Sequence, residues 1–167
     1  MRTLYLLRHA KSSWDRADLA DHDRPLAPRG QRATNRLAKH LRSAGISPSL
    51  VLCSSAERAR ETLDGIAPGF ESEVPVQVDR TLYGASSDAL LERLRALGDA
   101  LDSVMLIGHN PAIQSLALSL GQGEELEQLE QKYPTGGLAT LTFAGSWRDL
   151  GPGAAELVEF VTPKGLD

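Results

Sequence analysis

The chain has 167 residues, which predicts a single domain over residues 1–167 that buries roughly 70% of the surface exposed on unfolding. Its formal net charge of −4 without a basic run argues against nucleic acid as a partner, and no apolar run reaches the ~20 residues of a membrane span. A single cysteine excludes an internal disulfide and, with an amino-terminal apolar run too short for a signal peptide, favours the cytoplasm.

The first predicted element is a short buried strand over residues 4–7, a uniformly apolar run. Arg8 and His9 follow it directly. Residues that follow a buried strand lie at the mouth of an open α/β sheet, where ligands bind. The pair supplies a fixed cation and an imidazole nitrogen that can act as a nucleophile. Taken alone, an Arg-His pair at a strand end could equally be a surface turn.

A loop and a helix follow this strand. Residues 14–27 are rich in Asp, His, Arg and Pro, which predicts a loop over the mouth of the site. Trp14 and His22 in this loop could contact a substrate, or the loop could pack for its own sake. Apolar residues then recur at helical spacing from Pro28 to Ala44, and Gly45 is expected to end that helix.

A second buried strand is predicted over residues 50–53, which places Cys53 in the core. A serine of the following Ser54-Ser55 pair can cap the next helix, and Arg58 falls in the first turn of that helix. A cation at a helix amino terminus opposes the helix dipole unless an anion binds there as well. Arg58 is therefore a candidate anion ligand.

A third buried strand is predicted over residues 104–107. Gly108 permits an unusual turn after it, Asn110 is a good helix N-cap, and Pro111 suits the first position of a helix. His109 therefore lies between the end of a strand and the start of a helix, as His9 lies at the end of the first strand.

The remaining elements carry no predicted function. A helix is expected to begin near Asp88, and residues 124–131 predict an acidic surface helix. Two late strands are expected over residues 138–143 and 156–161, joined by a turn-rich segment around Trp147.

The three strand ends predict one composite site. Parallel strands open at the same edge of a sheet, so Arg8, His9, Arg58 and His109 are expected to surround one small space. Two guanidinium groups, two imidazoles and the free N–H groups of helix termini suit a tetrahedral dianion such as phosphate. The expected fold is α/β, with a mostly parallel central sheet and helices on both faces.

The same segments resemble the histidine phosphatase superfamily, branch 1. The resemblance is carried by the strand followed by Arg8-His9, by residues 54–62 (Ser-Ser-Ala-Glu-Arg-Ala-Arg-Glu-Thr) and by Gly108-His109-x-Pro111. The short chain and the Arg24-Pro25-Leu26-x-x-x-Gly30 segment are most similar to the SixA-type phosphohistidine phosphatases. The resemblance runs from about Thr3 to the end of the chain and implies a phosphoglycerate mutase-like fold.

The resemblance also implies roles for residues. His9 would be the nucleophile and become phosphorylated, and Arg8, Arg58 and His109 would hold the phosphoryl oxygens; Ser12 and Asn110 are further expected phosphate-binding residues. An imidazole can form a phosphoramidate that water then hydrolyses, with cations stabilising the transition state. No cofactor or metal is expected, because the four histidines show no metal-ligand spacing.

Three positions depart from the family pattern. Ala10 stands where the family usually has glycine, and Asp15 stands where mutase-type relatives carry asparagine. Asp15 could point away, pair with Lys11 or Arg8, or act as an acid. Thr81 stands where many relatives carry a general-acid glutamate. The candidate replacements for that acid are Asp15, Asp21, Asp23 and Asp79.

The expected function is therefore hydrolysis of phosphohistidine in a phosphorylated protein by a monomeric enzyme. A phosphatase for a small phosphorylated metabolite, such as a sugar phosphate or a nucleotide, is one alternative, and a non-catalytic phosphohistidine-binding module is another. A phosphoglycerate mutase is less favoured, because the chain looks too short for substrate-enclosing insertions. The Cys-x5-Arg pattern of tyrosine phosphatases fails, because Ala59 stands where that arginine would have to be.

Overall fold

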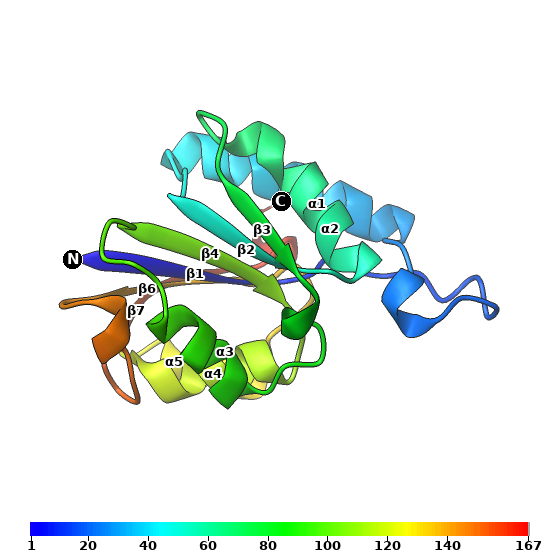
Figure 1. Cartoon of the computed structure of the whole chain (residues 1–167). Coiled ribbons are helices and arrows are strands. Elements are labelled where there is room, and N and C mark those ends of the chain that lie inside the picture. Colours follow the sequence, from blue (N-terminus) through cyan, green and yellow to red (C-terminus); the bar gives the residue numbers. More distant parts are fainter. Residues whose placement is uncertain (167) are drawn as a thin grey trace.

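The computed structural model describes residues 1–166, which form one seven-stranded sheet in the order β3-β2-β4-β1-β6-β7-β5 (Figure 1). The strands are β1 (Arg2–Arg8), β2 (Leu50–Ser54), β3 (Val76–Asp79), β4 (Ser103–Gly108), β5 (Gly121–Gln122), β6 (Leu138–Phe143) and β7 (Ala155–Val161). Strands β1 to β4 run parallel to their neighbours in this group, and β6 is antiparallel to both β1 and β7. The predicted mostly parallel sheet is confirmed.

Two helical layers cover the sheet (Figure 1). The helices are α1 (Pro28–Ala44), α2 (Glu57–Ile66), α3 (Ser87–Arg95), α4 (Ala112–Leu120) and α5 (Leu126–Gln131). Helices α1 and α2 pack on one face, and α3, α4 and α5 pack on the other. Within residues 1–166, no helix combines the length and the apolar character that a bilayer crossing demands.

The strands alternate their side chains between these two layers. In β4, Val104 and Leu106 join the core under α3 and α4, whereas Met105 and Ile107 join the core under α1 and α2. Successive side chains of a strand point to opposite faces, so a strand covered on both sides must be apolar throughout. This burial explains the uniformly apolar runs that locate the central strands in the sequence.

Helix α1 has the predicted bounds for identifiable reasons. Gly45 follows it in the left-handed conformation, with φ of 68°, and its backbone N–H bonds to carbonyls of the last turn. At its start, a Cβ atom on Gly30 would lie 2.1 Å from the carbonyl oxygen of Lys11. Only glycine permits this close approach, which fixes α1 against the segment that follows β1.

Two predicted helix starts need correction. Pro111, not Asn110, is the N-cap of α4, and the Asn110 side chain instead accepts a hydrogen bond from the Gln114 backbone N–H at 3.2 Å. Neither serine caps α2: Ala56 holds that position, because the helix begins at Glu57. Ser54 is the last residue of β2, and its hydroxyl accepts from the Ala56 N–H at 3.3 Å.

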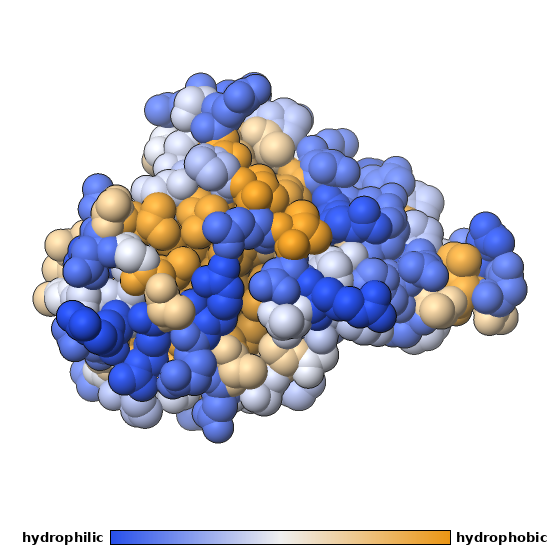
Figure 2. Space-filling view, in the orientation of Figure 1, coloured by the Kyte–Doolittle hydropathy of each residue, from blue (hydrophilic) through white to orange (hydrophobic). Residues whose placement is uncertain are grey.

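The edge strand β3 was not predicted. Its Val76 and Val78 side chains are 43% and 51% exposed, and apolar surface gathers along this side of the molecule (Figure 2). An edge strand covered on neither face has no burial to impose a pattern on it.

The acidic segment 124–131 is helical only from Leu126, and its Leu129 is buried.

Candidate active site

The carboxyl ends of β1, β2 and β4 bring the predicted site residues together. Arg8 is in register with Gly108, and the His9 backbone N–H bonds to the Gly108 carbonyl at 3.0 Å. The rings of His9 and His109 consequently lie with their centroids 5.1 Å apart. Arg58 reaches the same space from the first turn of α2.

His9 is held in one tautomer. Its Nδ1 atom lies 2.7 Å from the carbonyl oxygen of Ala10, and because a carbonyl can only accept, Nδ1 carries the proton and Nε2 carries the lone pair. Burial lowers the His9 pKa to about 3; the charges of His109, Arg58 and Arg8 act in the same direction, against the Ala10 hydrogen bond. The ring is therefore neutral near pH 7, as a nitrogen nucleophile must be.

The cluster contains buried nitrogen atoms that are left without hydrogen-bond partners within the described residues. The Nε atoms of Arg8 and Arg58 and the Nδ1 atom of His109 are buried and have no hydrogen-bond partner among residues 1–166. Arg8 also donates from Nη1 to the Tyr133 carbonyl at 2.9 Å, which fixes its orientation. Buried polar groups are nearly always bonded, so a cluster of unpaired ones indicates a ligand.

His109 has a hydroxyl partner on its other nitrogen. Its Nε2 atom lies 2.8 Å from Ser54 Oγ, which ties the end of β4 to the end of β2. Burial lowers the His109 pKa to about 4, with Arg58 acting in the same direction and Asp21 opposing it. A bound dianion would favour the protonated ring, so His109 is suited to hold a phosphoryl oxygen.

Asp21 is the one candidate acid that contacts this cluster. Its Oδ2 atom accepts from Tyr83 Oη at 2.6 Å and from Arg58 Nη2 at 3.0 Å, and its Oδ1 atom accepts from Arg24 Nε at 3.2 Å. The hydrogen bond from Tyr83, followed by the Arg58 and Arg24 contacts, lowers the Asp21 pKa to about 2. The carboxyl group is thus ionised, which makes it an internal anion and a poor proton donor.

The other three aspartates lie outside the cluster. Asp15 points away: it is exposed and pairs with neither Lys11 nor Arg8 within the described residues. Asp23 is exposed and lies 3.5 Å from His22. Asp79, at the end of β3, accepts from the N–H and the hydroxyl of Thr81, both at 2.8 Å, and these bonds lower its pKa.

Ser12 and Asn110 are bonded to neighbouring parts of the protein. Ser12 is buried, and its hydroxyl accepts from Arg24 Nη1 at 2.9 Å. Asn110 donates to the Tyr133 carbonyl, the oxygen that also accepts from Arg8. Both side chains position other residues of the site, and direct contact with a phosphoryl group stays a prediction.

Ala10 tolerates its methyl group where glycine was expected. No residue other than glycine has a positive φ in the described chain, so the Ala10 backbone is unstrained. Its N–H donates to Thr62 Oγ1 at 3.0 Å, and the Thr62 hydroxyl donates to the Arg58 carbonyl at 2.7 Å. This chain of bonds couples the His9 segment to helix α2.

Sequence reasoning missed two tyrosines. Tyr83 follows η3 (Arg80–Leu82), donates to Asp21, and lies with its ring 5.7 Å from that of His109. Tyr133 is buried and donates to the Leu6 carbonyl at 2.5 Å. Only the position of Tyr83 in the sequence could have indicated a role in the site, because Tyr83 stands two residues after Thr81, where the resemblance places the general acid of many relatives. No comparable signal marks Tyr133.

An uncharged groove of about 440 Å³ opens beside His109. Leu82, Leu90 and Pro111 give it apolar walls, and Ser86, Ser87 and Ser115 give it hydroxyl groups. A pocket of this size can take a ring or a short chain segment next to His109.

The residues that the structure describes contain neither a cluster of metal ligands nor a reactive thiol. No group of three or more His, Cys, Asp or Glu side chains within residues 1–166 is placed to hold a metal ion. Cys53 is buried in β2, and burial raises its pKa to about 12. The thiol is therefore protonated and part of the core, as predicted.

Comparison with known proteins identifies similar chains. A model of the histidine phosphatase superfamily (branch 1) matches residues 4–85. An uncharacterized protein of Mycobacterium leprae (strain TN) is 40% identical over 167 residues, which cover 95% of this chain and 100% of that protein. Two proteins provisionally assigned as phosphohistidine phosphatase SixA, from Nakamurella multipartitia and Agrobacterium tumefaciens, have similar structures. Each is 30% identical; the TM-scores are 0.83 and 0.82, with 97% of this chain and 96% and 98% of theirs covered.

Proposed function

The chain belongs to branch 1 of the histidine phosphatase superfamily as a metal-independent phosphatase of the SixA type, and we propose that it hydrolyses phosphohistidine in proteins through a phosphorylated His9. The observation that carries the proposal is the contact of His9 Nδ1 with the Ala10 carbonyl. This contact leaves the lone pair on Nε2, in a ring whose neighbours include two guanidinium groups and a second imidazole.

The first step transfers the phosphoryl group to His9. The Nε2 lone pair attacks phosphorus, and the bond from phosphorus to the substrate nitrogen breaks. Its electron pair leaves with the substrate imidazole, whose other ring nitrogen takes a proton from solvent, so the ring leaves neutral. The phosphorylated His9 ring keeps its Nδ1 proton, and the Ala10 carbonyl accepts the hydrogen bond from the resulting cationic ring. Arg8, Arg58 and His109 stabilise the negative charge on the equatorial oxygens.

The second step returns the enzyme to its starting state. Water attacks phosphorus, the bond between phosphorus and His9 Nε2 breaks, and the electron pair returns to Nε2. The products are inorganic phosphate and one proton. The same cations stabilise both transition states, so the cycle needs no group beyond those of the cluster.

The electrostatics near the leaving group favour phosphohistidine over phosphate esters. Asp21 is the only candidate acid in contact with the cluster, and its pKa of about 2 leaves it without a proton near pH 7. An imidazole with a pKa of roughly 6.5 takes a proton from solvent near neutral pH and leaves as a neutral ring. The uncharged groove beside His109 has room for that ring.

A substrate comparison tests the proposal. The purified chain is incubated with a protein phosphorylated on histidine, a phosphoserine peptide and glucose 6-phosphate, and release of phosphate is measured for each. We expect kcat/KM for the phosphohistidine protein to exceed the other two by at least 100-fold. Comparable or higher values for the ester substrates would refute the proposed substrate class while leaving the phosphatase chemistry intact.

A further inference from the structure

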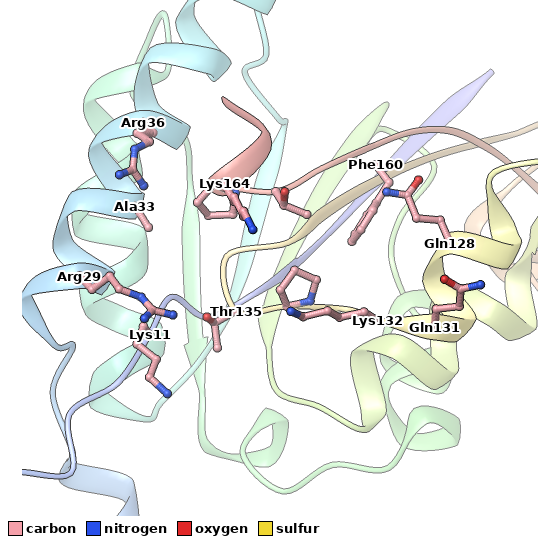
Figure 3. Close-up of a pocket in the computed structure, with 13 residues that line it drawn as sticks. Lys11, Arg29, Ala33, Arg36, Gln128, Gln131, Lys132, Thr135, Phe160 and Lys164 are labelled. Carbon is pink, nitrogen blue, oxygen red and sulfur yellow. The ribbon is translucent and has the colours of Figure 1, made fainter. Parts of the chain in front are cut away.

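A second, larger pocket lies between α1 and the carboxyl-terminal part of the chain (Figure 3). Its volume is about 640 Å³. The lining comes from Lys11, from α1, from residues 128–135 around the end of α5, and from residues 160–164. None of Arg8, His9, Arg58 or His109 belongs to this lining.

Among residues 1–166, the charged side chains that line this pocket are all cationic. They are Lys11, Arg29, Arg36, Lys132 and Lys164, and no carboxylate of these residues belongs to the lining. Apart from Arg36, these side chains form no ion pair within residues 1–166. The chain as a whole is acidic, with 22 Asp and Glu against 18 Lys and Arg. A concave surface with charge of one sign concentrates the electrostatic potential and attracts counter-ions.

This arrangement of cations lowers the stability of the protein when no anion is bound. Unpaired cations around one cavity repel each other, and their contribution to stability is negative until an anion neutralises them. Elsewhere the chain pairs its cations locally, as Arg60 pairs with Glu57 and Arg95 with Glu92. Residues that break such a local rule are commonly functional.

The remaining lining fits a small molecule. Phe160, Pro134 and Pro163 provide apolar contact, and Gln128, Gln131, Thr135 and Thr162 provide hydrogen-bonding groups. The volume falls within the ~300–1,000 Å³ of small-ligand pockets. The large apolar side chains that the chain exposes, such as Trp14 and Val76, lie outside this lining. A protein interface would use such residues as anchors.

The pocket adjoins the phosphatase site but is separated from it by backbone. The Gly136 N–H bonds to the carbonyls of Arg8 and His9, both at 3.0 Å, and the Tyr133 carbonyl accepts from Arg8. The backbone of residues 132–136 thus separates the two sites. The Tyr133 carbonyl lies toward Arg8, whereas the Lys132 and Thr135 side chains lie in the larger pocket, which we call the basic pocket.

From these observations we propose that the basic pocket binds a small polyanion, a molecule with two or more phosphate or carboxylate groups, at a site separate from the one that holds the transferred phosphoryl group. Lys11 and Arg29 lie at one side, where α1 meets the segment after β1, and Lys132 and Lys164 extend from the other segments (Figure 3). A ligand that bridges these cations also covers Phe160.

Binding of inorganic tripolyphosphate in metal-free buffer tests the separation of the two sites. Titration calorimetry is performed on the free enzyme and on enzyme saturated with orthovanadate, which occupies the phosphoryl site as a phosphate mimic. We expect one tripolyphosphate per chain in the enzyme saturated with orthovanadate and at least one in the free enzyme, with an affinity that falls as salt increases. Absence of binding, or loss of binding when orthovanadate is present, overturns the proposal.

Charge-matched variants locate the ligand. The double variant Arg29→Gln/Lys132→Gln removes two cations of the pocket, whereas Arg32→Gln/Lys39→Gln removes two exposed cations of α1 outside it. We expect the first to weaken tripolyphosphate binding at least tenfold and the second less than twofold. Equal effects of the two double variants would mean that the net charge of the chain alone determines tripolyphosphate binding, which would contradict the proposed site. Unchanged tripolyphosphate binding, with a raised KM for a phosphohistidine protein, would indicate a protein-docking surface and contradict the proposal.

Discussion

Asp21 accepts hydrogen bonds from both terminal nitrogen atoms of the Arg58 guanidinium group. The Arg58 Nη2 atom donates to Asp21 Oδ2 at 3.0 Å, and Nη1 donates to the Asp21 carbonyl at 2.8 Å. Arg58 is almost fully buried at the start of α2, whereas the Asp21 side chain is half exposed. Asp21 and an anionic ligand would therefore compete for the positive charge of Arg58, whose buried Nε atom has no partner among residues 1–166.

Removing the Asp21 charge is therefore expected to strengthen anion binding. In Asp21→Asn, orthovanadate should inhibit three- to tenfold more strongly, because a negative charge no longer competes for Arg58. Solvent screening of a half-exposed group keeps the effect modest. The matched variant is Asp23→Asn, which removes an exposed charge two residues away and should change inhibition less than twofold. Unchanged or weaker inhibition in Asp21→Asn would contradict this account of the contact.

His9 should carry the phosphoryl group during turnover. Quenching a reaction of radiolabelled aryl phosphate is expected to trap a phosphoprotein that is labile in acid and stable in base, and that is missing in His9→Ala. Arg58→Ala and His109→Ala should each lose at least ~10²-fold in kcat, by analogy with removal of one transition-state donor. Full activity of His9→Ala would refute the assignment of the nucleophile.

The two buried histidines make stability depend on pH. Their pKa values of about 3 for His9 and about 4 for His109 lie below the unfolded value of roughly 6.5. Between these values the unfolded chain binds more protons. The stability is therefore not reduced by these two histidines above about pH 6.5, and it falls as the pH is lowered toward 4 for His109 and toward 3 for His9. The fall in Tm from pH 7 to pH 5 should be smaller in His9→Gln and smallest in His9→Gln/His109→Gln. Parallel Tm curves for the wild type and both variants would rule out this origin.

Activity should not depend on a metal. Dialysis against a chelator is expected to leave kcat/KM unchanged within twofold, because the proposed mechanism takes its charge stabilisation from Arg8, Arg58 and His109. Loss of activity that zinc or magnesium restores would show that a metal ion takes part. A chelator-treated sample supplemented with calcium serves as the control for a general effect of divalent ions.

The central strands and the clustering of Arg8, Arg58 and His109 could be predicted because burial leaves a pattern. Residues 4–7, 50–53 and 104–107 are covered on both faces, so they are apolar throughout, and parallel pairing brings Arg8, Arg58 and His109 to one edge. No such pattern marks the contact of Asp21 with Arg58 or with Tyr83. Those contacts depend on the path of a loop across distant segments, which local sequence does not specify.

The chemistry of the leaving group provides the last prediction. An alkoxide is nearly as basic as hydroxide, with a conjugate-acid pKa near water's ~15.7, and needs a proton in the transition state. A positioned acid contributes about 10²–10⁴-fold, and the carboxyl group nearest the cluster is ionised, with a pKa of about 2. Rates should therefore rank phosphohistidine above aryl phosphates and aryl phosphates above alkyl phosphates.

A series of aryl phosphates with graded phenol pKa values measures this dependence. We expect log kcat/KM to fall steeply as the phenol pKa rises. A flat plot, or alkyl esters hydrolysed as fast as aryl esters, would show that a proton donor acts in the site. Asparagine variants at Asp15, Asp21, Asp23 and Asp79 would then identify it. The donor's variant would convert a flat plot into a steep one, whereas the other three would leave the slope unchanged.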